Sequence, residues 1–151
     1  MPEEYKKRIE AGRPRFNAVA LQQYGLVINS GPSGQNSRPA LVGAKYAEEA
    51  GRGEQYHARV LRAMWHDAAR IDDLVVLSGL AVEAGLNQDE FMQALERVDL
   101  DELVTADVDQ ARDYGLNGVP AIVINNRYLI SGAQPYEVIK EAVDKVRASQ
   151  P

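Results

Sequence analysis

The sequence has 151 residues, of which 45% are apolar and 26% are charged. This length and composition are typical of one compact globular domain with a buried core. The 17 lysines and arginines are outnumbered by 22 aspartates and glutamates, giving a formal net charge of −5. That charge disfavours nucleic acid or an anionic membrane as a partner. The absence of cysteine excludes disulfides, thiolate metal sites and a thiol nucleophile from this chain.

The apolar stretches are too short for a membrane segment. The longest, Leu74 to Val82, is interrupted by Ser78 and Gly79 and falls well short of the roughly 20 residues that a spanning helix needs. The first seven residues are mostly polar or charged and lack the apolar region of a secretory signal. We therefore expect a cytoplasmic protein with no membrane partner.

The first quarter of the chain gives an irregular pattern. Short helices are predicted over 3–10 and 17–24, because Gly12-Arg13-Pro14 between them is a helix-breaking sequence. Ser30 to Ser37 is rich in residues that favour turns, and without the ending of a phosphate-binding loop it indicates a plain linker. Residues 1–36 are accordingly predicted to be an irregular N-terminal segment.

Helical periodicity dominates the middle of the chain. Apolar residues recur at the spacing of one helix face in five successive segments. These segments are about 37–50, about 54–69, Asp72 to Ala84, Asn87 to Leu95 and about 99–114. Asn87 with Glu90 three residues later resembles a capping box.

The period then changes to that of a β-hairpin. Ala121 to Ile124 and Arg127 to Ser131 are two strand-like runs, and Asn125-Asn126 between them tolerates the positive φ of a tight turn. Pro135 opens a final helix. Because Ala121 to Ile124 is apolar at every position, both faces of that strand should be covered, yet one hairpin is marginal in water. We therefore predict a fold that lacks part of its sheet, and a homodimer formed through the exposed strand.

Several chemically capable side chains have a structural explanation. His57 and His66 are nine residues apart on one predicted helix, so they face opposite sides and cannot share a metal. Asp72-Asp73 is typical of a helix N-cap, and Met64 with Trp65 fits a core stripe. No catalytic residue, metal site or cofactor is predicted.

The segment Gly115 to Pro135, GLNGVPAIVINNRYLISGAQP, resembles the C-terminal signature of DsbA-family thioredoxin-fold proteins, especially the FrnE-like branch. Segments within 37–51 and 71–86 resemble the helical domain that this family inserts into its thioredoxin fold. The resemblance implies a mostly α protein with a small β-hairpin. Residues 37–98 would be the helical insertion domain and 99–148 the C-terminal part of an incomplete thioredoxin-like α/β fold.

The resemblance also implies a function, thiol–disulfide exchange on protein substrates. The family begins with a strand, a Cys-x-x-Cys helix start and a second strand, none of which is in this sequence. We therefore expect a fragment that is catalytically silent by itself. The resemblance further implies a cis bond before Pro120 and a substrate-binding loop of Gly118, Val119 and Pro120 that contacts a peptide or protein substrate.

Two alternatives stay open from the sequence. The chain could be a non-catalytic peptide-binding module that uses the same proline loop. It could also be a relative of kappa-class glutathione transferases and 2-hydroxychromene-2-carboxylate isomerases, whose glutathione-binding serine would lie in the region absent here. Ser131 to Gln134 resembles the FrnE-like branch better than this second group.

Overall fold

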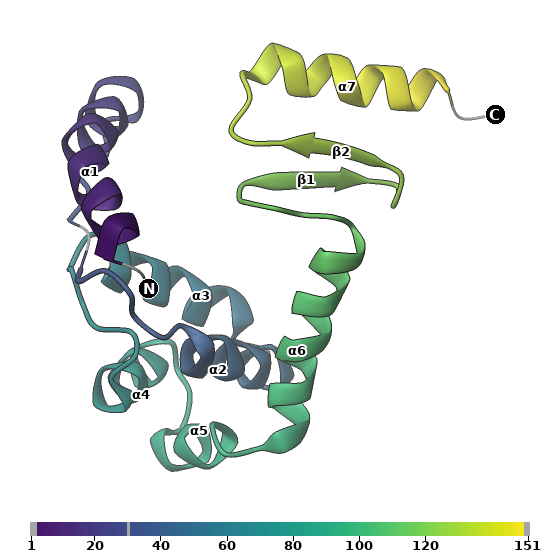
Figure 1. Ribbon diagram of the computed structural model, residues 1–151. Helices are drawn as coiled ribbons and strands as arrows, with labels where there is room; N and C mark the ends of the chain where they lie inside the picture. The colour runs from purple at the N-terminus through teal and green to yellow at the C-terminus, as the bar shows by residue number, and fades with distance from the viewer. Residues whose placement is uncertain (1–2, 30, 150–151) are drawn as a thin grey trace. The chain divides into compact units, whose positions relative to one another are not determined.

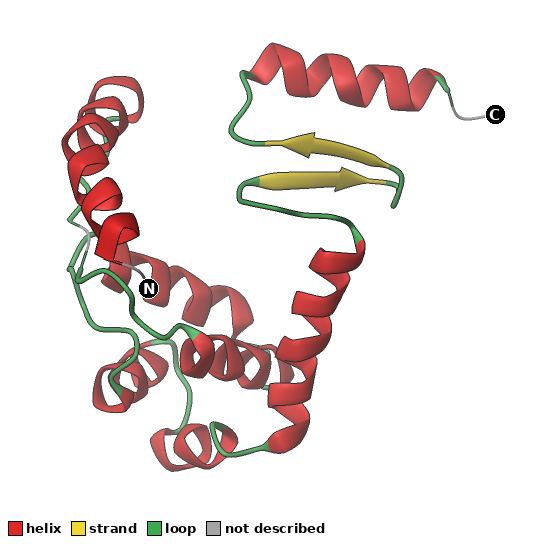
Figure 2. Cartoon of the chain, in the orientation of Figure 1, coloured by secondary structure: helices red, strands yellow, loops and turns green. Residues whose placement is uncertain are grey.

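The computed structural model describes residues 3–29 and 31–149, which form two compact units, residues 1–104 and 105–151 (Figure 1). The helices that lie in or begin in the first unit are α1 (Glu3–Tyr24), α2 (Arg38–Glu49), α3 (Gly53–Trp65), α4 (Leu74–Glu83), α5 (Gln88–Ala94) and α6 (Val98–Asp113). The second unit contains β1 (Ala121–Ile124), β2 (Tyr128–Ser131) and α7 (Tyr136–Ala148). Figure 2 shows this mostly helical composition with one hairpin, which confirms the predicted fold class. The domain limits at 36/37 and 98/99 stay a prediction.

Helices α2 to α5 enclose the main core of the first unit. Tyr56 of α3 and Phe91 of α5 are fully buried, with ring centroids 5.5 Å apart. Burial raises the pKa of the Tyr56 hydroxyl. Gly43 of α2 lies against this aromatic pair, where a Cβ atom would come within 2.6 Å of the Tyr56 hydroxyl and 2.8 Å of the Phe91 ring. Each fully buried side chain of this size contributes about 1.5–3 kcal/mol.

The first helix differs from its prediction. Residues 3–24 form one continuous helix with Pro14 inside it, so the predicted break at Gly12-Arg13-Pro14 was wrong, as was an irregular start over these residues. Residues on both sides of the proline make tertiary contacts that hold the helix in place. Arg13 donates to the Gly31 carbonyl, and the Phe16 ring packs 6.3 Å from that of Trp65.

The loops that join the helices also follow local chemistry. The Asn87 side chain accepts from the Glu90 amide at 3.0 Å, so the predicted Asn87 cap is confirmed. The Asp73 side chain accepts from the Val75 amide at 2.8 Å, so the cap of α4 is Asp73 rather than Asp72, where the helix was predicted to start. The helix predicted over 54–69 instead ends at Trp65. Ala68 has a positive φ of 54°, outside the range of a right-handed helix.

The hairpin pairs its strands in antiparallel register, with Ile122 opposite Ile130 and Ile124 opposite Tyr128. Asn125 and Asn126 have φ values of 53° and 54°, which confirms the predicted turn. The second strand starts at Tyr128 rather than at Arg127 because the register leaves Arg127 outside the ladder. Helix α7 contacts β2, and Figure 1 shows the two strands and α7 side by side.

None of the helices in the described part of the chain combines the length and the apolar character needed to cross a membrane.

The segment predicted to be a linker is held to the first unit by hydrogen bonds over its described residues 31–37. Gln35 accepts from the Ile71 amide at 2.7 Å, and Ser33 accepts from Arg13 at 3.1 Å. Describing this segment as a plain linker was therefore wrong. Ser30 lies outside the described residues.

Candidate functional site

The loop between α6 and β1 contains the three residues expected to bind substrate, Gly118, Val119 and Pro120. Helix α6 closes at Gly115, whose φ of +67° suits glycine and whose amide donates to the Arg112 carbonyl at 2.8 Å. The chain then runs through Leu116 to Pro120 and enters β1. The three predicted residues are consecutive in the chain, and the structure places them in the loop that leads into β1.

The loop is hydrogen-bonded to the hairpin at Pro120 and is exposed to solvent at Val119. The Pro120 carbonyl accepts from the Gly132 amide at 2.9 Å, which ties the start of β1 to the residue after β2. Val119 is 95% exposed, and the Val119–Pro120 peptide bond is cis. Within the described part of the chain, the backbone N–H and C=O groups of Gly118 and Val119 have no hydrogen-bond partner.

The groups in this loop can form hydrogen bonds to a ligand but cannot catalyse a reaction. Residues 116–120 contain no side chain that can act as an acid, a base or a nucleophile. Their exposed backbone groups are strong donors and acceptors that can pair with another extended chain. The neighbouring β1 strand adds an apolar surface, since Ile122 is 40% exposed.

The comparison with known families agrees with the resemblance noted in the sequence. The sequence profile of the DSBA-like thioredoxin domain matches residues 6–144. The chain belongs to this family. This DsbA-like chain is mostly helical with one hairpin, and its sequence has no cysteine.

Solved structures and a curated relative resemble this DsbA-like chain. A probable DsbA oxidoreductase from Streptomyces coelicolor is 28% identical with a TM-score of 0.82, covering 96% of this chain and 63% of that protein. A candidate protein disulfide isomerase from Nitrosomonas europaea shares the fold at 20% identity and a TM-score of 0.75, covering 99% of this chain and 78% of that protein. The uncharacterized protein YwbO of Bacillus subtilis (strain 168) is 29% identical over 105 residues, 69% of this chain. The DsbA-like chain thus spans about half, 52%, of YwbO.

The histidines and the acidic pair do not form a reactive cluster. His57 lies within α3, whereas His66 caps the end of that helix through its amide, which donates to the Arg62 carbonyl. Asp73 caps α4, and Asp72 accepts from Arg70 at 2.9 Å, which lowers the pKa of the Asp72 carboxyl. No group of three or more His, Asp or Glu side chains that could hold a metal exists within the described residues.

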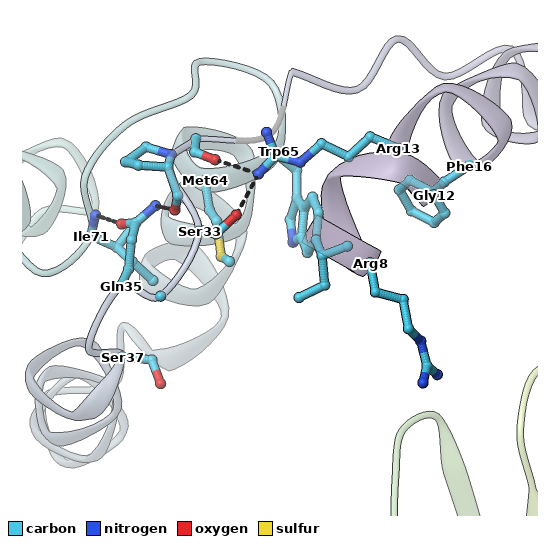
Figure 3. Close-up of a pocket in the computed structure, with 14 residues that line it drawn as sticks. Arg8, Gly12, Arg13, Phe16, Ser33, Gln35, Ser37, Met64, Trp65 and Ile71 are labelled. Atoms are coloured by element: carbon cyan, nitrogen blue, oxygen red, sulfur yellow. Dashed lines mark hydrogen bonds between the residues drawn. The ribbon is translucent and has the colours of Figure 1, made fainter. Parts of the chain in front are cut away.

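A concave site that the sequence did not reveal lies beside α1. This α1 pocket has a volume of about 570 Å³. Figure 3 draws its lining residues, which come from α1, from the loop 31–37 and from the end of α3 with Ile71. Met64 and Trp65, expected in the core, are only half-buried because they form part of this wall. No signal in the sequence marks this pocket, because Phe16 and Trp65 are 49 positions apart and only the structure shows that they meet.

Proposed function

We propose that this DsbA-like chain binds an extended segment of a protein substrate at Gly118, Val119 and Pro120 and performs no thiol–disulfide exchange by itself. The observation that carries the proposal is that, among the described residues, nothing pairs with the backbone groups of Gly118 and Val119, which lie on a loop that leads into β1 and in which Val119 is exposed. Membership of a family that includes a probable DsbA oxidoreductase supports a protein substrate.

Catalytic silence follows from the chemistry of exchange. A disulfide is broken by attack of a thiolate, through a mixed disulfide. This sequence contains no cysteine, so neither the attacking nor the resolving sulfur is available from it. Any exchange in which the chain takes part has to use thiols supplied by other sequence.

The binding mode we propose is strand addition. An extended peptide beside the loop would accept a hydrogen bond from the Val119 amide and donate one to the Val119 carbonyl, because the N–H and C=O of one extended residue face the same side, as in other complexes that add a strand to a sheet edge. Main-chain pairing of this kind is tolerant of the peptide's sequence. The exposed Val119 and Ile122 side chains would favour apolar residues in the bound segment.

The same hairpin supports a second proposal, that two copies of the chain associate. Paired residues of the hairpin share a face, so Ile122 and Leu129, 40% and 47% exposed, leave apolar surface on opposite faces. The sheet within the described residues has only these two strands, so each strand has an edge that is not paired within it. Association of two hairpins would pair an exposed strand edge and bury part of this apolar surface.

Isothermal titration with reduced, alkylated insulin B chain tests the peptide proposal. Val119→Pro removes the backbone donor, and Val119→Ala keeps it while removing most of the side chain. We expect Val119→Pro to weaken binding by about tenfold, the loss of one well-formed hydrogen bond, and Val119→Ala to weaken it far less. Equal affinity of the two variants, with both hairpins intact by NMR, would refute the proposed mode.

A further inference from the structure

The α1 pocket has the dimensions and the walls of a small-molecule site. Its volume of about 570 Å³ lies within the range of about 300–1,000 Å³ that is typical of ligand pockets. The rings of Phe16 and Trp65 lie 6.3 Å apart in its wall, with Met64 and Ile9 beside them. Phe16 is 50% exposed there, so a ligand would cover an aromatic surface that water now contacts.

The charges around the α1 pocket have one sign. Arg8 and Arg13 are its charged lining residues, and no acidic residue lines it, although the whole chain has a net charge of −5. Arg13 uses a single nitrogen, Nη2, for both of its bonds, to the Gly31 carbonyl and the Ser33 hydroxyl. Among the described residues, nothing accepts from its Nε and Nη1 or from Arg8. Guanidinium donors of this kind pair best with a carboxylate.

The loop that forms one wall of the pocket is fixed in place by the protein itself. Gln35 accepts from the Ile71 amide at 2.7 Å and donates to the Pro32 carbonyl at 3.3 Å (Figure 3). Gly31 is packed so closely that a Cβ atom there would lie 2.9 Å from Gln35 Nε2 and 3.0 Å from the Ala68 carbonyl. The pocket is therefore formed before a ligand arrives, which reduces the entropic cost of binding.

From this geometry we infer that the α1 pocket binds a small carboxylate with an apolar body, of the class of medium-chain fatty acids. The apolar part lies against Phe16, Met64 and Trp65. The carboxylate lies beside Arg13, where it accepts from Nε and Nη1 of that guanidinium. The residues of this pocket belong to the first unit and Gly118 to Pro120 belong to the second, and this inference does not rest on the proposed function.

Fluorescence of Trp65, the single tryptophan of the chain, measures occupancy directly. Octanoate, octanol and octylammonium share a chain length and differ in charge. We expect octanoate to change the emission saturably and to bind about tenfold more tightly than octylammonium, with the preference shrinking as salt is added. Equal affinity of the anion and the cation would overturn the inference, as would an emission that no probe changes.

Two substitutions locate the ligand. Gly12 lines the pocket and a Cβ atom there meets nothing within 4 Å, so Gly12→Leu should fill the space without disturbing the helix. Gly79→Leu is the matched control, because Gly79 is also a helical glycine with open surroundings and lies outside the pocket. We expect Gly12→Leu to abolish the octanoate response and Gly79→Leu to keep it. Unchanged binding in a folded Gly12→Leu variant would place the ligand elsewhere and contradict the inference.

A third substitution tests whether an arginine side chain binds the carboxylate. Arg13→Gln removes the guanidinium at the loop wall of the pocket, and Arg8→Gln is the control, because the Arg8 guanidinium points away from Trp65 (Figure 3). In Arg13→Gln, octanoate affinity should fall by about threefold to tenfold while octanol affinity stays the same, and Arg8→Gln should change both affinities by less than about twofold, the effect of one remote charge. An equal loss for both probes in Arg13→Gln would mean that Arg13 contributes packing rather than charge, and the carboxylate assignment would be wrong.

Discussion

Arg38 at the start of α2 and Asp101 in the first turns of α6 form a two-point ion pair. Arg38 Nη2 donates to Asp101 Oδ2 at 2.6 Å, Nε donates to Oδ1, and Nη2 also reaches the Asp101 carbonyl at 3.2 Å. The hydrogen bonds from Arg38 lower the pKa of the Asp101 carboxyl, and those same bonds raise the pKa of the guanidinium. This pair fastens α6 to the core of the first unit.

The Arg38–Asp101 pair predicts a pH-dependent stability. Because the folded-state pKa of Asp101 is lowered, its contribution is complete above the unfolded pKa and is lost as pH falls through the folded value. Urea unfolding should therefore find Arg38→Gln less stable than the parent at neutral pH, with the difference shrinking as pH falls below the unfolded-state pKa of about 4 and through the lowered folded-state pKa. Arg112→Gln, which breaks an exposed pair within α6, is the control and should differ little at any pH. A difference between the parent and Arg38→Gln that persists in acid would assign Arg38 a packing role instead.

The close contact at Gly43 predicts a large effect from one methyl group. Gly43→Ala places a Cβ atom against Tyr56 and Phe91, whose buried rings have no room to move, so it should destabilise the chain by about 1–3 kcal/mol. Gly79→Ala, in a helix with open surroundings, should instead stabilise by up to about 1 kcal/mol. Denaturant midpoints measure both, and a neutral Gly43→Ala would show that the α2–α5 packing is looser than described.

The sequence predicted caps and turns correctly where they depend on residues that are close together in the chain. The Asn87 cap and the Asn125-Asn126 turn depend on residues within a few positions, and both were recognised. The break at Pro14 was not a break, because Arg13 and Phe16 make tertiary contacts that no local pattern contains. The early end of α3 is likewise set by the turn at Ala68, a residue with no intrinsic preference for positive φ.

Of the two candidate sites, the one formed by consecutive residues was predicted from the sequence, and the one formed by distant segments was not. Gly118, Val119 and Pro120 were found through a family resemblance, since no periodicity marks a binding loop. The α1 pocket was missed because its walls come from three segments that are separate in sequence. Trp65 could be placed on a helix face from the sequence, but its partner Phe16 could not.

The exposed hairpin predicts association of two copies. Light scattering with size exclusion should give about twice 16.6 kDa at micromolar concentration. Ile122→Lys puts a charge on the apolar face of β1 and should return the mass to that of one chain, whereas Val75→Lys, at an 80% exposed site of α4, should leave it unchanged. A folded monomer in the parent chain would contradict the proposed pairing.

The absence of sulfur nucleophiles predicts no redox turnover. The purified chain should leave the rate of insulin reduction by dithiothreitol at the level of the blank, because no mixed disulfide can form with it. A DsbA-like oxidoreductase that contains both cysteines serves as the positive control. Turnover that follows the chain through a second purification step would refute catalytic silence.

Amide hydrogen exchange at Val119 tests the peptide-binding proposal most directly. In the free chain this amide is exposed and has no described acceptor, whereas the Gly132 amide is already bonded to the Pro120 carbonyl and serves as the internal control. With saturating insulin B chain, exchange at Val119 should slow by about tenfold or more while Gly132 changes little. Fast exchange at Val119 in the saturated complex would contradict strand addition at Gly118, Val119 and Pro120.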